Sequence, residues 1–117
     1  MGRRFEELDV RGMSQELIRG LGRIFYADTF RNRGFQDQIM RSAISIANNV
    51  AEGNERGSDR DFVKFLYYAK GSAGEVRSML YSAQDFKYIT NEQFILFADQ
   101  CIRISTKINN FITSLKK

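Results

Sequence analysis

Regularly spaced arginines are the residues of this chain best suited to binding a partner molecule. Twelve arginines accompany six lysines, and the formal net charge is +4 over 117 residues. A guanidinium group binds phosphate oxygens in bidentate fashion, so this bias is compatible with nucleic acid. On the first predicted helix one basic ridge recurs every four residues: Arg11, Gln15, Arg19 and Arg23. The candidate nucleic-acid contacts are therefore Arg11, Arg19, Arg23, Arg31, Arg33 and Arg41.

The same charges have a plainer interpretation as a solvated, ion-paired surface. Acidic residues lie close by in the sequence at Glu16, Asp28 and Asp37, and no RNP or helix-turn-helix signature accompanies the arginines. Two functions therefore stay open at this point. One is binding of RNA or DNA through the arginines, and the other is a protein-interaction adaptor or scaffold whose charge serves solubility.

A second polar group interrupts an apolar, helix-forming stretch. Asn48 and Asn49 are poor helix formers there, and Asn49 and Glu52 stand three residues apart on one side of the helix. We interpret these residues as part of a polar clasp that fixes the register of two helices, with a ligand site as the alternative. The clasp comprises Asn49, Glu52, Arg56, Ser72 and Glu75, with Arg41 as a further partner for Glu75.

Composition argues against most enzymatic chemistry. With one cysteine and no histidine, the chain has neither the ligands of a zinc site nor an imidazole to activate a nucleophile. Its carboxylates show no organised metal-ligand spacing. We therefore predict a protein that is not an enzyme, with no catalytic residue, no metal and no cofactor. Cys101 falls on an apolar stripe and is expected to be buried.

Helices must position these residues, because the chain has no proline and its apolar residues recur at spacings of three and four. The first predicted helix covers residues 9–27 with Asp9 as N-cap, and the second covers residues 35–52 with Gly53 as its stop. The third begins after an N-cap at Ser58. The fourth begins at Thr90, which forms a capping box with Gln93.

The spacing and the short connections predict an all-α, antiparallel up-down four-helix bundle, a single domain over residues 1–117. Helix three carries small and aromatic residues beyond one core stripe, among them Gly71 and Gly74, which indicates a second interface and hence a homo-oligomer. No apolar run approaches the roughly 20 residues of a membrane span, and no signal segment is visible. We expect a cytoplasmic protein without membrane contact.

Two long patterns resemble a known family. The first is Gln38-Ile39-x-Arg41-x-Ala43-x-Ser45-Ile46-x-x-Asn49-Val50-Ala51-Glu52-Gly53. The second is Ser58-x-x-x-Phe62-x-x-Phe65-Leu66-x-x-Ala69-x-Gly71-Ser72-x-x-Glu75. With Phe5-Glu6-Glu7-Leu8-Asp9-Val10 and Ala83-x-Asp85-x-x-Tyr88-Ile89, they resemble the bacterial 23S rRNA intervening-sequence proteins over nearly the whole chain. The chain departs from that family at Arg11, at Phe30-Arg31 and at Ala47-Asn48, where an aromatic residue, Phe-Pro and Pro-Ser are usual.

This resemblance implies an up-down four-helix bundle that assembles into a ring-shaped homopentamer without known catalysis. The family is also similar to the accessory proteins of diversity-generating retroelements, which are basic pentamers that work with a reverse transcriptase and nucleic acid. By analogy, this second likeness favours the nucleic-acid hypothesis.

Overall fold

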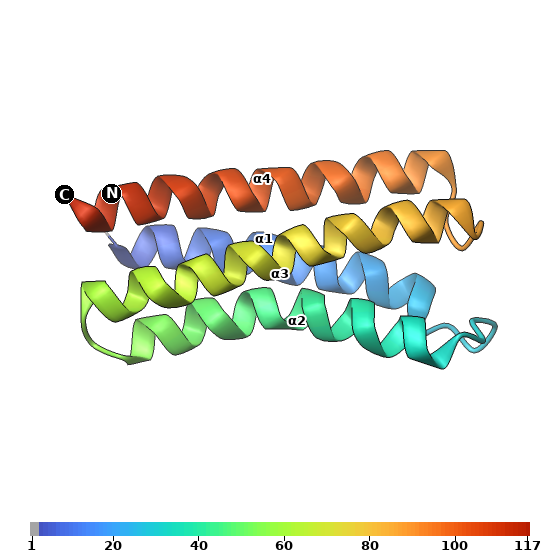
Figure 1. The fold of residues 1–117 in the computed structure, drawn as a ribbon, viewed down its shortest axis with the longest axis horizontal. Helices are drawn as coiled ribbons and strands as arrows, with labels where there is room; N and C mark the ends of the chain where they lie inside the picture. The colour runs from blue at the N-terminus through green and yellow to red at the C-terminus, as the bar shows by residue number, and fades with distance from the viewer. Residues whose placement is uncertain (1–2) are drawn as a thin grey trace.

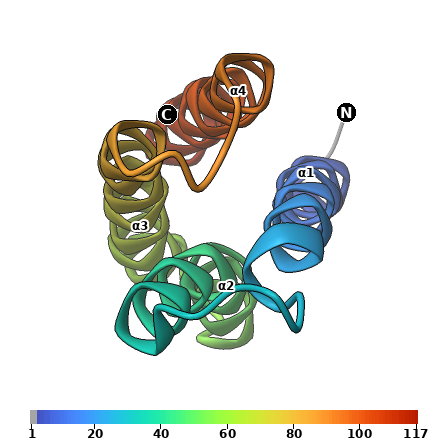
Figure 2. The same ribbon diagram turned by 90° about the vertical axis from the view of Figure 1, so that its right-hand side faces the viewer.

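The computed structural model describes residues 3–117, which form four helices joined by short turns (Figure 1). Helix α1 spans Arg3–Phe25, α2 spans Arg33–Glu55, α3 spans Asp59–Asp85 and α4 spans Asn91–Lys116. Consecutive helices run in opposite directions along the 45 Å long axis. The end-on view shows them at the corners of a square, with α4 returning to α1 (Figure 2). The predicted antiparallel up-down four-helix bundle is confirmed.

One apolar stripe from each helix forms the core. Leu17, Ile46, Leu66 and Ile104 are fully buried, one from each of the four helices. The alternating spacing of four and three directs each stripe inward along the whole length of its helix. Cys101 is 1% exposed and belongs to this core, as predicted. No helix among residues 3–117 has an apolar stretch long enough to cross a membrane.

The predicted starts of α3 and α4 are correct. The Ser58 hydroxyl accepts a hydrogen bond from the backbone N–H of Asp61, and Thr90 forms a complete capping box with Gln93. Helix α2 begins in the same way, because Asn32 Oδ1 accepts from the N–H of Phe35 at 3.0 Å. These caps satisfy backbone donors that have no partner within the helix.

The predicted start of α1 at Asp9 is wrong, since the helix already begins at Arg3. Its buried stripe extends back to Glu7, which is 2% exposed. Instead of capping, the Asp9 carboxylate pairs with Lys107 Nζ of α4 at 3.0 Å. The helix ends at Phe25, two residues before the predicted Ala27.

Gly53 does not end α2, which continues to Glu55. A Cβ atom on Gly53 would lie 2.8 Å from Cβ of Phe65 and 2.9 Å from Cδ1 of Phe62, both on α3. This glycine therefore permits the close approach of α2 to α3. The reversal of the chain uses Gly57, whose φ of +86° lies in the left-handed region that glycine adopts without strain.

Candidate nucleic-acid interface

Positive charge is concentrated in residues 19–41. This segment contains five arginines and two aspartates, so it carries +3 of the formal net charge of +4. It comprises the end of α1, the α1–α2 turn and the start of α2, which lie together at one end of the bundle (Figure 1). The N-terminus of α2 adds the positive end of its helix dipole. This end of the molecule therefore suits an anionic partner.

The five arginines of this segment are all exposed, and none forms an ion pair within residues 3–117: Arg19, Arg23, Arg31, Arg33 and Arg41. Asp28 and Asp37 lower the net charge of the segment but form no ion pair with these arginines in the described structure. Their guanidinium donors are thus available for phosphate, with which arginine forms short charge-assisted hydrogen bonds.

The sixth candidate, Arg11, is placed differently. Its Nη1 lies 3.0 Å from Oε2 of the buried Glu7, one helical turn earlier, so Arg11 already neutralises an internal carboxylate. Arg3, Arg56 and Arg103 are likewise paired, with Asp59, Glu52 and Asp99. Arg4, Arg60 and Arg77 also form no ion pair, but they are spread over α1 and α3. Residues 19–41 are therefore distinguished by holding five unpaired arginines in one short segment.

Aromatic packing fixes the turn that carries Arg31 and leads into α2 at Arg33. The Phe30 ring meets the Tyr88 ring edge to face with centroids 4.8 Å apart, and Asn32 Nδ2 donates to Tyr88 Oη at 3.0 Å. These contacts join the α1–α2 turn to the α3–α4 turn. The second turn presents exposed Lys87 in the left-handed region, with φ +62°, and so brings a further cation to the same end. Sequence reasoning missed Lys87, because only the folded chain brings the two turns together.

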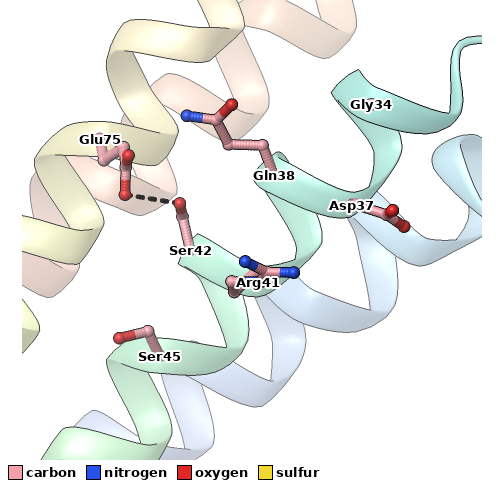
Figure 3. A pocket seen from close by; sticks show the side chains of 7 residues that line it. All are labelled: Gly34, Asp37, Gln38, Arg41, Ser42, Ser45 and Glu75. Atoms are coloured by element: carbon pink, nitrogen blue, oxygen red, sulfur yellow. Dashed lines mark hydrogen bonds between the residues drawn. The ribbon is translucent and has the colours of Figure 1, made fainter.

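Three residues of the predicted clasp lie along the seam between α2 and α3. Ser42 Oγ donates to Glu75 Oε1 at 2.6 Å (Figure 3). The hydroxyls of Ser45 and Ser72 lie 2.9 Å apart. Asn49 Nδ2 donates to both the carbonyl and the hydroxyl oxygen of Ser45. Two separate hydrogen-bonded groups therefore hold these residues, and each depends on a serine that sequence reasoning did not select. The signal for the two serines was the spacing of Ser42, Ser45 and Asn49 at three and four residues.

The other two clasp residues form a separate pair. Glu52 and Arg56 lie 2.9 Å apart on the exposed last turn of α2, and the Arg56 guanidinium stacks over the Phe65 ring of α3 at 4.8 Å. The expected pair between Arg41 and Glu75 is absent from the described part of the chain. Figure 3 shows Arg41 directed away from Glu75, whose carboxylate instead accepts from Ser42.

Arg41 stands between two surface hollows. The first, of about 440 Å³, lies on the α2–α3 seam and is lined by Gly34, Asp37, Gln38, Arg41, Ser42, Ser45 and Glu75 (Figure 3). The second, of about 390 Å³, is lined by Tyr26, Asp37, Arg41, Ile44, Ser45 and Asn48. Both are large enough for a small organic group.

Metal ligands and a reactive thiol were sought among residues 3–117. Within residues 3–117 no three His, Cys, Asp or Glu side chains gather as a ligand set. Burial raises the pKa of the Cys101 thiol to about 12, and the nearby Arg77 opposes that shift only in part. The thiol is therefore protonated at neutral pH and is a poor nucleophile.

Comparison with known proteins agrees with this architecture. The profile of the 23S rRNA-intervening sequence protein family matches residues 6–110. The fold is similar to the crystal structure of a protein of unknown function from the S23 ribosomal protein family of Bacteroides thetaiotaomicron. The TM-score is 0.83 at 23% identity, covering 92% of this chain and 98% of the other. The comparison with curated proteins gives no match.

Proposed function

The chain belongs to the 23S rRNA-intervening sequence protein family, and we propose that it is a non-enzymatic, oligomeric nucleic-acid-binding protein of the cytoplasm. The observation that carries the proposal is the group of five exposed, unpaired arginines in residues 19–41. RNA or DNA is the partner that such a group suits, because a row of phosphates matches several guanidinium groups at once.

Counterion release makes this proposal quantitative. Each phosphate neutralised by an arginine releases condensed cations, so the logarithm of the binding constant falls linearly with the logarithm of salt concentration. Five contacts give a slope of about −3.5 on a single strand and about −4.5 on duplex DNA. Binding through apolar or other uncharged contacts would show little dependence on salt concentration.

Filter binding of a structured RNA over a salt series tests the function. We expect measurable binding near physiological salt that weakens steeply as salt rises. Affinity without salt dependence, or no binding near physiological salt, would contradict the proposal. The protein must first be freed of co-purified nucleic acid, which the absorbance ratio at 260 and 280 nm reports.

Self-association is the second part of the proposal. The outward face of α3 exposes Tyr67, Gly71 and Gly74, and a Cβ atom on either glycine would meet no atom within 4 Å. This face therefore has no packing role within the described chain, yet its glycines lower helix propensity. A neighbouring subunit that approaches closely accounts for them, and the family resemblance favours a homopentamer.

A protein-interaction adaptor is the competing function. Exposed apolar side chains favour it: Ile95 is 66% exposed, Tyr67 46% and Ile102 44%, on the outer faces of α3 and α4. Pull-down from lysate with and without nuclease separates the two functions. A nucleic-acid-binding protein loses its associated proteins when nucleic acid is destroyed, whereas an adaptor keeps them.

A further inference from the structure

We propose that the hollow between Tyr26 and Asn48 receives one unstacked base of a single-stranded nucleic acid. The inference rests on the proposed function and makes it more specific, because it selects single strands over duplexes. Three features of the hollow carry it, namely an available aromatic ring, an unpaired amide and the adjoining arginines.

The Tyr26 ring is suitably placed for stacking. It is 56% exposed, and a Cβ atom on Gly22 would lie 3.6 Å from the ring and 3.8 Å from Met40 Cε. The ring therefore lies near the seam where α1 meets α2. Tyr81 and Tyr88 pack against other rings, whereas Tyr26 has no aromatic partner within residues 3–117. A free face of this kind stacks with any base.

The remaining lining matches the chemistry of a base. Ile44, 36% exposed, supplies an apolar surface, and the exposed Asn48 amide makes no hydrogen bond within the described chain. An amide offers both donors and an acceptor, as does the Watson–Crick edge of a base. The carboxylate of Asp37 provides a further acceptor for an exocyclic amino group. The volume of about 390 Å³ accommodates a planar ring of this size.

The phosphate contacts adjoin the hollow. Arg41 lines it directly. Arg19 and Arg23 share one face of α1, and Tyr26 follows the last residue of that helix on the same side, three residues after Arg23. A strand that runs from Arg41 toward Arg23 therefore places a base near Tyr26. In a duplex the bases are stacked and paired, so a base reaches this ring only after it is unstacked.

Fluorescence anisotropy with a short labelled oligonucleotide, alone and annealed to its complement, tests the inference at one fixed salt concentration. We expect Tyr26→Ala to weaken single-strand binding about tenfold and to leave duplex binding unchanged. Tyr26→Phe keeps the ring and should retain wild-type affinity. Phe5→Ala is the matched control, because it removes a similarly exposed aromatic ring (52%) from the first turn of α1, outside the basic segment. Circular dichroism and molar mass confirm the fold and assembly of each variant.

The outcomes separate this inference from the proposed function. The base site is wrong if Tyr26→Ala keeps wild-type affinity for the single strand, or if it loses affinity equally for the single strand and the duplex. In either case, salt-dependent binding by the wild-type protein would still support the proposed function. If the wild-type protein binds neither the single strand nor the duplex, the base site and the proposed function are both wrong. Should Tyr26→Ala misfold, Asn48→Ala decides in its place, because that exposed position tolerates alanine. Its unchanged single-strand affinity would then count against the site.

Discussion

Ser42 Oγ on α2 donates a 2.6 Å hydrogen bond to Oε1 of Glu75 on α3, directly beside Arg41. Ser42 is 5% exposed, whereas Glu75 lies at the surface. The bond therefore joins the buried edge of α2 to the exposed edge of α3. It gives Glu75 a partner other than Arg41, whose guanidinium stays available to a ligand.

Replacing Ser42 tests whether this bond stabilises the seam. We expect Ser42→Ala to lower the free energy of unfolding by about 1 kcal/mol, since a charged acceptor strengthens the bond and solvent weakens it. Urea denaturation measures the change. The control is Ser78→Ala, an exposed serine of α3 that makes no side-chain hydrogen bond within residues 3–117. Equal stability of the two variants would contradict this role for Ser42.

Gly53 tests the close approach of α2 and α3. We expect Gly53→Ala to lower the free energy of unfolding by about 1–3 kcal/mol, because the new Cβ meets Cβ of Phe65, which is fixed to the backbone. Gly12→Ala is the matched change at an open helical position of α1, outside the proposed subunit interface, and its gain in helix propensity should raise stability by about 0.5–1 kcal/mol. If Gly53→Ala is also stabilising, the contact does not restrict α2.

The bundle was predictable because its stripes are long and regular. From Phe62 to Ala83 the apolar positions alternate between spacings of four and three over 22 residues, and each of these positions is buried. Two wrong helix boundaries were predicted at residues whose contacts are made by another helix. Asp9 is a residue type that often caps a helix N-terminus, but here it pairs with Lys107. Gly53 is a residue type that often ends a helix, but here it packs closely against Phe65 within α2.

The candidate site was predictable only in part, for a similar reason. The sequence shows arginines at Arg23 and Arg41, but whether a guanidinium is neutralised depends on which carboxylates the fold brings near it. Asp37 is four residues from Arg41 and still forms no ion pair with it in the described structure. The hollow beside Tyr26 depends on how α1 packs against α2, which no local pattern encodes.

Cys101 should be inert in the folded protein. Burial raises the pKa of its thiol to about 12, so almost no thiolate exists at pH 8. Because this pKa exceeds the value of about 8.5 in an unfolded chain, the neutral thiol favours folding below that pH. That contribution is lost as the pH rises toward 12. A disulfide reagent should label Cys101 at pH 8 only after denaturant is added. Rapid labelling without denaturant would contradict the buried position.

The open face of α3 gives a test of assembly. We expect the double variant Gly71→Gln/Gly74→Gln to lower the molar mass in solution relative to the wild-type oligomer, because two long side chains obstruct close approach. Light scattering coupled to size exclusion measures the mass. Gly12→Gln is the control, as a Cβ there also meets no atom within 4 Å, but on α1. A wild-type monomer would contradict self-association, and an unchanged oligomer in the double variant would place the interface elsewhere.

The central claim is that the unpaired arginines of residues 19–41 bind nucleic acid. Its most direct test compares two double variants that each remove two positive charges. Arg23→Gln/Arg41→Gln takes them from the unpaired group, and Arg56→Gln/Arg103→Gln takes them from arginines held in ion pairs. Both change the net charge equally, and circular dichroism checks that loss of the Arg56 and Arg103 ion pairs leaves the fold of the control intact.

The measurement is the slope of the logarithm of the binding constant against the logarithm of salt concentration, for RNA with each variant. Loss of two phosphate contacts should make the slope of Arg23→Gln/Arg41→Gln shallower by about 1.5, with weaker binding throughout. The control should keep the wild-type slope. Equal slopes for the two variants would contradict the assignment of binding to this end of the bundle.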